Sequence, residues 1–190
     1  MTVATADRAA VHRQLRRTPR GLRRVAHRCG CGLPDVVETA PRLEDGTPFP
    51  TTYYLTCPRA AAAVGTLESD GLMAVMTQRL HDEPELRGRY QAAHKDYLAR
   101  RSAIEAVPEL AGTSAGGMPE RVKCLHVLVA HSLAAGPGVN PLGDEALAAL
   151  EPWGQRGPCI DIDGIDIDGI DIDGTDLGCT DPGGTDPREH

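Results

Sequence analysis

The spacing of apolar residues changes near residue 58, and this change separates predicted strands from predicted helices. Before residue 58, apolar and β-branched residues alternate or run together in short stretches, as they do in β-strands. Three such stretches cover residues 22–29, 36–40 and 51–56. The turn and loop residues between them predict an antiparallel meander, in which the first and third strands run in the same direction.

After residue 58 the apolar residues recur at intervals of three and four, which is the spacing of one helix face. The predicted helices cover residues 59–69, 71–81, 84–104, 119–135 and 141–150. A run of strands followed by a run of helices indicates the α+β class. We therefore expect a small three-stranded antiparallel meander packed by about four helices.

Two segments flank this core domain, which we place at residues 21–151. Residues 1–20 form a basic N-terminal arm, and residues 6–17 within it have helical spacing. Residues 152–190 contain an acidic five-residue repeat that reads IDIDG three times and then degenerates. Because the repeat is dense in aspartate and lacks aromatic residues, we expect a disordered acidic tail.

Net charge differs strongly between these segments. The whole chain carries −7, but residues 1–34 contain eight arginines and one acidic residue, whereas residues 159–190 contain ten acidic residues and one base. The negative charge therefore belongs to the tail and says little about a partner of the core. The arginine-rich arm has no aromatic residues that could stack on bases, so we do not expect nucleic-acid binding.

Composition also argues against several classes of protein. No stretch approaches the roughly 18 consecutive apolar residues of a membrane-spanning helix, so we expect no membrane insertion. The first residues lack the apolar stretch of a secretory signal, which favours a cytoplasmic location. Six cysteines in such a chain are expected to be thiols or metal ligands rather than disulfides.

The cysteine and histidine residues are spaced in a way that predicts a metal site. In the expected meander, Cys29 and Cys57 follow the first and third strands at the same edge of the sheet. Cys124 and His131 are seven residues apart in the most apolar helix, which puts them on one face. Zinc, or iron, takes four ligands of these types, so our preferred set is Cys29, Cys57, Cys124 and His131. Cys31 and His126 are held in reserve. A residue two positions after Cys124, such as His126, points elsewhere unless the helix begins late.

The same residues also have a purely structural interpretation. Cysteine is among the most buried residue types, so Cys57 and Cys124 can be small apolar members of the core. His131 can be a hydrogen-bonded core histidine. Metal analysis of the purified protein distinguishes the two interpretations.

A glycine-rich loop before the apolar helix predicts an anion site. Backbone N–H groups at the start of a helix attract anions, and two basic side chains lie nearby. The residues concerned are Ser114, Gly116, Gly117, Arg121 and Lys123. Their spacing matches neither a P-loop nor a dinucleotide-binding fingerprint, and a simple helix start capped by Ser114 or by backbone is the favoured explanation.

Three functions remain open from these residues. The first is a small accessory or binding protein with a metal or anion site. The second is an enzyme in which Cys124 is the nucleophile and a neighbouring histidine is the base. The third is a protein-interaction module without small-molecule chemistry, which implies a protein partner. The sequence predicts no catalytic residue with a defined role and no substrate.

Several long blocks resemble a known family. They read TAPRLEDGTPFPTTYYLTCP, LESDGLMAVMTQRL, AAHKDYLARR and SAGGMPERVKCLHVLVAHSLAAGPGVNPLGDEAL. Together they are similar to the uncharacterised actinobacterial family called domain of unknown function 501, over about residues 18–150. The resemblance implies no activity, substrate or catalytic residue, and it excludes the acidic tail. It does imply that the predicted cysteine and histidine ligands lie in or beside the family's characteristic blocks.

Overall fold

The structure is a computed structural model in which residues 3–161 are described. Three strands and six α-helices occur within this part of the chain. In chain order they are α1 (Thr5–Leu15), β1 (Leu22–Arg28), β2 (Pro34–Thr39), β3 (Tyr53–Leu55), α2 (Pro58–Ser69), α3 (Leu72–Asp82), α4 (Pro84–Ile104), α5 (Leu125–Ala135) and α6 (Pro141–Ala148). Two short 3-10 turns, η1 (Pro108–Leu110) and η2 (Trp153–Arg156), complete the set. The acidic repeat, for which disorder is predicted, falls almost wholly in residues 162–190 and so lies outside the described residues.

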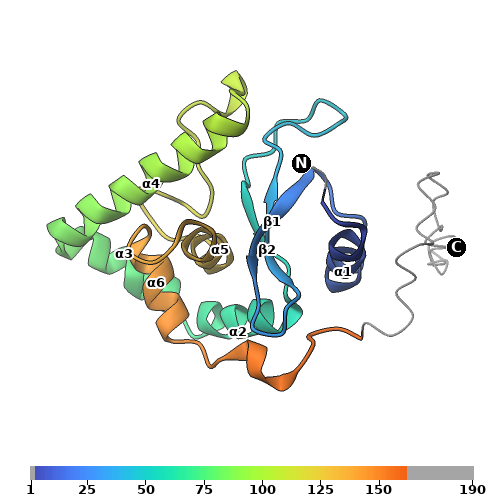
Figure 1. Cartoon of the computed structure of the whole chain (residues 1–190). Helices are drawn as coiled ribbons and strands as arrows, with labels where there is room; N and C mark the ends of the chain where they lie inside the picture. The colour runs from blue at the N-terminus through green and yellow to red at the C-terminus, as the bar shows by residue number, and fades with distance from the viewer. Residues whose placement is uncertain (1–2, 162–190) are drawn as a thin grey trace, which may run out of the picture.

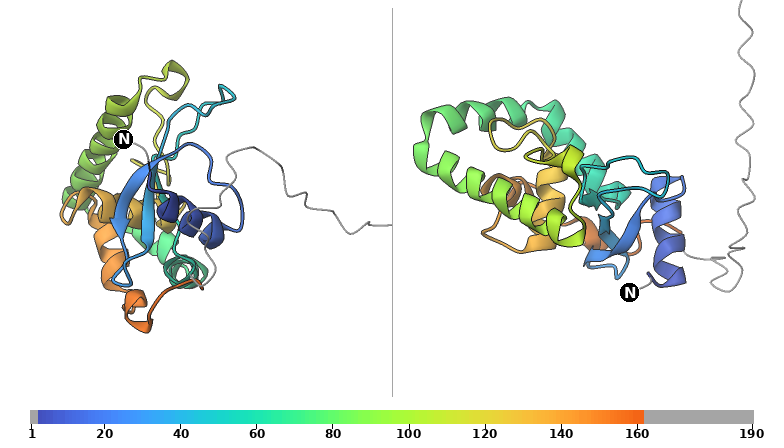
Figure 2. Two further views of the ribbon diagram at one scale, coloured as in Figure 1. Left: turned by 45° about the vertical axis from the view of Figure 1, so that its right-hand side comes forward. Right: turned by 90° about the horizontal axis from the view of Figure 1, so that it is seen from above.

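The three strands form the predicted antiparallel meander, in the order β1-β2-β3. Every residue of the central strand β2 is buried. Burial on both faces follows from the arrangement of helices, because α1 lies against one face of the sheet and α5 against the other (Figures 1 and 2). This explains why the strand has a run of adjacent β-branched residues, Val36 and Val37, instead of strict alternation.

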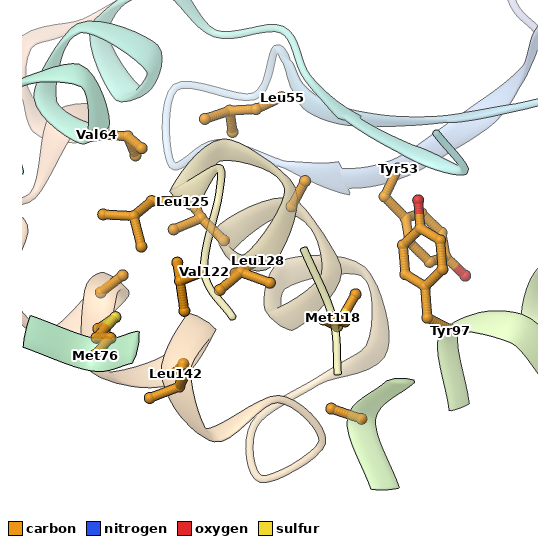
Figure 3. Close-up of a cluster of buried hydrophobic side chains, with 14 of the residues drawn as sticks. Tyr53, Leu55, Val64, Met76, Tyr97, Met118, Val122, Leu125, Leu128 and Leu142 are labelled. Carbon is orange, nitrogen blue, oxygen red and sulfur yellow. The ribbon is translucent and has the colours of Figure 1, made fainter. Parts of the chain in front are cut away.

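The main core lies between the sheet and helices α2 to α6. Tyr53 and Leu55 enter it from β3, Val64 from α2, and Leu125 and Leu128 from α5 (Figure 3). Each side chain of this size contributes about 1.5–3 kcal/mol when it is fully buried, so this cluster supplies most of the apolar driving force. On the other face of the sheet, α1 buries the smaller residues Ala10 and Val11.

Helices α5 and α6 approach each other closely at a glycine. A Cβ atom added to Gly143 would lie 2.8 Å from the carbonyl carbon of Leu128 and closer still to its oxygen. The start of α6 is fixed beside this contact by Asn140, whose side-chain oxygen accepts the Gly143 N–H at 3.1 Å. The prediction of a helix that begins after Asn140, with Pro141 in its first turn, is therefore confirmed.

The predicted start of helix α5 is wrong by six residues. The helix begins at Leu125 instead of residue 119. Gly116 and Gly117 have φ angles of 70° and 93°, and the Lys123 N–H donates to the Gly116 carbonyl at 2.7 Å. This bond closes the chain into a compact loop, and apolar spacing alone could not reveal it. The other predicted helices agree with the structure within a few residues.

The chain after α6 crosses the domain and packs against it. Trp153 and Cys159 contact the main core, and Arg59 donates hydrogen bonds to the carbonyls of Gly157 and Pro158, each at 2.8 Å. The segment ends beside α1, where Arg13 donates to the Asp161 carbonyl at 2.7 Å. None of the helices in the described part of the chain has both the length and the apolar character that crossing a membrane requires.

Candidate functional site

Three side chains with metal-binding chemistry meet where the end of α2 approaches the start of α5. They are Glu68, Cys124 and His126. One ligand atom from each lies within 4.8 Å of those from the other two, and all three residues are half-buried. Within residues 3–161, no other group of three or more cysteine, histidine or acidic residues meets this distance limit.

The late start of α5 brings Cys124 and His126 together. In a continuous helix, side chains two residues apart point about 200° away from each other. Cys124 instead precedes the helix, with an extended backbone at φ −157° and ψ 111°. Its side chain can therefore face the same way as that of His126, which lies in the first turn. The helix thus begins late, which is the condition under which the sequence predicts that His126 and Cys124 can bind the same ion.

Glu68 holds the end of α2 against the start of α5 through contacts with Leu125 and His126. Its Oε1 atom accepts the backbone N–H of Leu125 at 2.6 Å and lies 3.1 Å from Nδ1 of His126. The other ring nitrogen of His126, Nε2, lies 3.1 Å from the carbonyl oxygen of Ala61. A carbonyl oxygen only accepts hydrogen bonds, so Nε2 carries a proton. The free N–H groups at the start of α5 thus receive a carboxylate supplied by the protein itself.

The contacts of His126 favour its protonated form in the metal-free protein. A hydrogen bond with Cys124 is the largest influence, and it raises the pKa of His126. Burial opposes this effect, but the hydrogen bond and charge of Glu68 add to it, and the pKa reaches about 9. The imidazole, the carboxylate and the thiol therefore interact as one group.

The preferred ligand set from the sequence is not brought together. Cys29 and Cys57 do lie at the same end of the sheet, but strand β2 runs between β1 and β3. Two strand spacings amount to roughly 9–10 Å, which is too far for two ligands of one ion. Cys29 sits in the β1–β2 turn, where its N–H donates to the Leu33 carbonyl, and burial raises the pKa of its thiol.

Cys124 and His131 are separated for a related reason. The sequence places them on one helix face, but Cys124 precedes α5, and six to seven residues at 1.5 Å each separate them by about 10 Å along the helix axis. His131 is fully buried near the other end of α5, among side chains of the core. Cys124 therefore lies with Glu68 and His126 instead of with His131.

His131 has the structural role that the sequence left open. Its ring stacks on Tyr53, with centroids 5.9 Å apart, and meets the edge of Tyr97 at 5.2 Å. Burial lowers the pKa of His131, so the ring is neutral and carries one proton. That proton lies on Nε2, which donates to Asp96 at 2.9 Å, while Nδ1 accepts from the Asn140 amide at 3.3 Å.

Asp96 is the partly exposed carboxylate that accepts the hydrogen bond of this buried ring. Burial opposes ionisation of Asp96, but hydrogen bonds from Arg100 and His131 outweigh that effect and leave its pKa below the ordinary value. The Arg100 Nε atom lies 2.6 Å from the carboxylate. His131 therefore has a polar partner on each ring nitrogen and none of its ligand capacity left over.

The glycine-rich loop does not open a helix directly. Arg121 and Lys123 donate their N–H groups to the carbonyls of Gly117 and Gly116, and Ser114 Oγ lies 3.1 Å from the Met118 carbonyl. These N–H groups are therefore used inside the loop. Anion binding by the loop stays a prediction. The reason for it is a predicted helix start next to Gly117, but the helix starts at Leu125.

Two residues of interest are not evident from the sequence. Glu68 lies 58 positions before His126, and no local spacing connects a glutamate at the end of one helix with the start of another. Cys159 lies within the predicted tail, but it packs against the core near Cys57. The sequence does contain one indication of Glu68, because this residue lies in one of the blocks that resemble the family.

Comparison with known proteins gives one match. The family model described as "Protein of unknown function (DUF501)" matches residues 25–148, which include Glu68, Cys124 and His126 but not Cys159. This confirms the resemblance noted from the sequence. A search of curated proteins and a search of solved structures each returned no match.

Proposed function

The chain belongs to the DUF501 family of proteins of unknown function, and we propose that it is a zinc-binding protein whose ion is held by Glu68, Cys124 and His126. The observation that carries this proposal is the convergence of one thiol, one imidazole and one carboxylate within 4.8 Å. Zinc binds all three ligand types, and the mixture of sulfur, nitrogen and oxygen suits it better than magnesium or calcium.

The distances leave little movement for the protein to make. With bond lengths of about 2.0–2.3 Å, the ligand atoms of a tetrahedral zinc site lie about 3.5 Å apart. The nitrogen and oxygen of His126 and Glu68 are already 3.1 Å apart. A small shift of half-buried side chains at two helix ends is sufficient to close the site.

The second ring nitrogen of His126 supports the same proposal. Histidines that ligate metals usually donate their other N–H to a carbonyl or carboxylate, which fixes the tautomer and the ring orientation. Nε2 of His126 faces the Ala61 carbonyl at 3.1 Å, and this contact leaves Nδ1, on the side of Glu68, as the metal ligand.

Three protein ligands leave one tetrahedral position for water or another molecule. Zinc sites with a purely structural role are usually closed by four protein ligands, whereas sites that bind or activate small molecules keep one position open. We therefore place the proposed site among those that bind a small molecule, with the polar edge between α2 and α5 as the point of access.

The enzyme with Cys124 as nucleophile is the competing function at the same residues. A thiol–imidazole–carboxylate series needs the thiol and the acid on opposite ring nitrogens. Here the Ala61 carbonyl faces Nε2 and Glu68 faces Nδ1, so the hydrogen bond of His126 with Cys124 has to share a ring nitrogen with one of them. The geometry therefore favours metal binding.

Zinc content and affinity of the full chain test the proposal. We expect one zinc per chain after purification without chelators, and cobalt substitution should give a thiolate-to-metal charge-transfer band. Cys124→Ser or His126→Ala should weaken zinc binding by more than about 100-fold, because loss of an outer-shell partner alone weakens metal affinity by about 10–100-fold.

Cys31→Ser is the matched control. Cys31 is also a half-buried thiol, but it lies in the β1–β2 turn outside the cluster, so this variant should bind zinc like the unmodified protein. Substoichiometric zinc in every variant, together with rapid selective alkylation of Cys124, would instead support the nucleophile. Zinc lost from Cys31→Ser but kept by Cys124→Ser would refute the proposed ligands.

A further inference from the structure

A pair of thiols meets at the other end of α2 from the proposed zinc site. Cys57 immediately precedes α2 and is 0% exposed, whereas Cys159 is half-buried in the segment that crosses the domain after α6. A hydrogen bond joins their side chains. Neither residue belongs to the zinc cluster, and Cys159 lies outside the residues matched by the family.

The surroundings of the two sulfur atoms differ. Gln14 of α1 donates from Nε2 to the Cys159 sulfur at 3.3 Å and to the Pro34 carbonyl at 2.7 Å. Its Oε1 atom is buried and has no hydrogen-bond partner among the described residues. Cys159 therefore receives N–H and S–H donors, while Cys57 sits among apolar core side chains.

These contacts set the order in which the two thiols lose their protons. The hydrogen bond from Cys57 has the largest effect and lowers the pKa of Cys159. Burial raises this pKa, but the hydrogen bond from Gln14 and the charge of Arg59 lower it further, to about 6. The same hydrogen bond, with burial, raises the pKa of Cys57 far above the ordinary value. At neutral pH Cys159 is thus the thiolate and Cys57 holds the shared proton.

Cys159 opens into a pocket of about 780 Å³ between α1 and α2. The charged and titratable side chains that line it are His12, Arg13, Arg16, Arg59 and Asp161, and Gln14 also faces it. Arg59 and Arg13 hold backbone carbonyls of the crossing segment, and they still contribute positive charge. A pocket with three arginines and one aspartate favours an anionic molecule.

We propose that Cys159 and Cys57 form a redox-active dithiol, which reduces an acidic low-molecular-weight disulfide bound in this pocket. The exposed sulfur and its buried partner supply the two roles that thiol–disulfide exchange requires, an attacking and a resolving cysteine. The positive side chains around Cys159 select the acidic disulfide.

The reaction consists of two exchange steps. The Cys159 thiolate attacks one sulfur of the disulfide R–S–S–R, which forms a mixed disulfide and releases R–S⁻. Cys57 then attacks the Cys159 sulfur and passes its proton to the departing R–S⁻, which breaks the mixed bond and releases the second half of the substrate as R–SH. The substrate gains two electrons, and the protein is left with a Cys57–Cys159 disulfide.

Reaction of the reduced full chain with glutathione disulfide tests this proposal. Peptide mapping should show a single intramolecular disulfide between Cys57 and Cys159, and Cys57→Ala should instead accumulate a mixed disulfide on Cys159. Cys159→Ser should form neither product. Because Cys159 is half-exposed, this last variant should keep its far-ultraviolet circular dichroism spectrum and so separate loss of reaction from loss of fold.

The dependence on pH is the sharper readout. The rate should reach half its maximum near pH 6, the pKa of Cys159, whereas an ordinary thiol gives a midpoint near about 8.5. The rate at pH 7 is less diagnostic, because a low pKa also makes the thiolate less nucleophilic and leaves an advantage of only about twofold.

Charge selectivity tests the pocket separately from the thiols. Anionic glutathione disulfide should react about tenfold faster than cationic cystamine at low salt, and the difference should shrink as salt is added. Arg16→Asn should slow glutathione disulfide several-fold and leave neutral hydroxyethyl disulfide unchanged. Asparagine suits this position because Arg16 has a φ of 53°.

A disulfide that links other cysteines, or a pH midpoint near that of an ordinary thiol, would overturn the proposal. Equal rates for the three disulfides would refute the assignment of an acidic substrate. The zinc site is tested on different residues, so either result leaves the conclusion about Glu68, Cys124 and His126 unaffected.

Discussion

The close contact between α5 and α6 makes a definite prediction for Gly143→Ala. Alanine is the better helix former by about 1 kcal/mol, so an exposed helical glycine should gain stability from this change. At Gly143 the new methyl group would meet the backbone of Leu128 and the hydroxyl of Ser132. Backbone atoms cannot rotate away, so α6 must move as a unit, which costs about 1–3 kcal/mol and sometimes more.

Movement of α6 also disturbs the bonds at its start. Ser132 Oγ donates to the Asn140 carbonyl at 3.2 Å in a buried position, and a bond of this kind contributes about 0.5–1.5 kcal/mol. Together these effects outweigh the gain in helix propensity, so the free energy of unfolding should fall by about 2 kcal/mol. With a urea slope of about 2 kcal/mol per molar, the denaturation midpoint should fall by about 1 M.

Gly65→Ala in α2 is the matched control, because a Cβ atom there meets nothing within 4 Å. Urea denaturation followed by circular dichroism should show a midpoint that rises by roughly half as much, since only the propensity of about 1 kcal/mol acts. A Gly143→Ala midpoint equal to or above that of the unmodified protein would show that α5 and α6 do not pack at this distance.

Three further predictions concern the core and the proposed site. Burial holds the pKa of His131 below the ordinary value, so between about pH 6.5 and the folded pKa only the unfolded chain binds a second proton on this ring. The free energy of unfolding should therefore be largest above about pH 6.5 and should decrease as the pH falls from there towards the folded pKa. An NMR titration of the His131 ring with a midpoint near pH 6.5 would contradict this prediction. Tyr97→Phe removes the acceptor of the buried Thr52 N–H, which lies 2.7 Å from the hydroxyl, and should lower the free energy of unfolding by about 1–3 kcal/mol in urea titrations. Tyr54→Phe, which loses only an exposed 3.4 Å contact, should change it by less than about 0.5 kcal/mol. Zinc should raise the melting temperature of the unmodified protein but not of Glu68→Gln, and an equal rise in both would exclude Glu68 as a ligand.

The architecture could be predicted because local and global preferences agree. Val36 and Val37 favour a strand in any context, and their burial on both faces strengthens that preference. Pro58 and Pro141 mark helix starts through their fixed backbone angle. Such signals depend on a few neighbouring residues, so one sequence is enough to detect them.

The start of α5 could not be predicted in the same way. Residues 119–124 contain good helix formers, and the loop exists because Gly117 allows the chain to fold back against Lys123. A Cβ atom at Gly117 would lie 2.7 Å from the Arg121 carbonyl oxygen, which shows how tightly this loop closes. That contact forms between residues in three dimensions, and apolar periodicity carries no record of it.

The candidate site depends on the same unpredicted loop. With the helix beginning at residue 119, Cys124 and His126 point apart, and His131 is the histidine on the same face as Cys124. With the helix beginning at Leu125, the two converge and Glu68 joins them from α2. The sequence therefore contains the residue types of a metal site. Which of these residues come together depends on where α5 begins and on the long-range contact of Glu68 with His126.

The hydrogen bonds around His131 run in one direction, and this gives the core a fixed proton count. The Gly143 N–H points to the Asn140 oxygen, the Asn140 amide to Nδ1 of His131, and Nε2–H of His131 to Asp96. Every link has one hydrogen and one lone pair, so reversing any link would place two hydrogens or two lone pairs face to face. An ionised aspartate at position 140 has nearly the same shape as Asn140 but cannot donate a hydrogen bond to Nδ1 of His131. The core therefore distinguishes nitrogen from oxygen at this position by hydrogen bonding and not by shape.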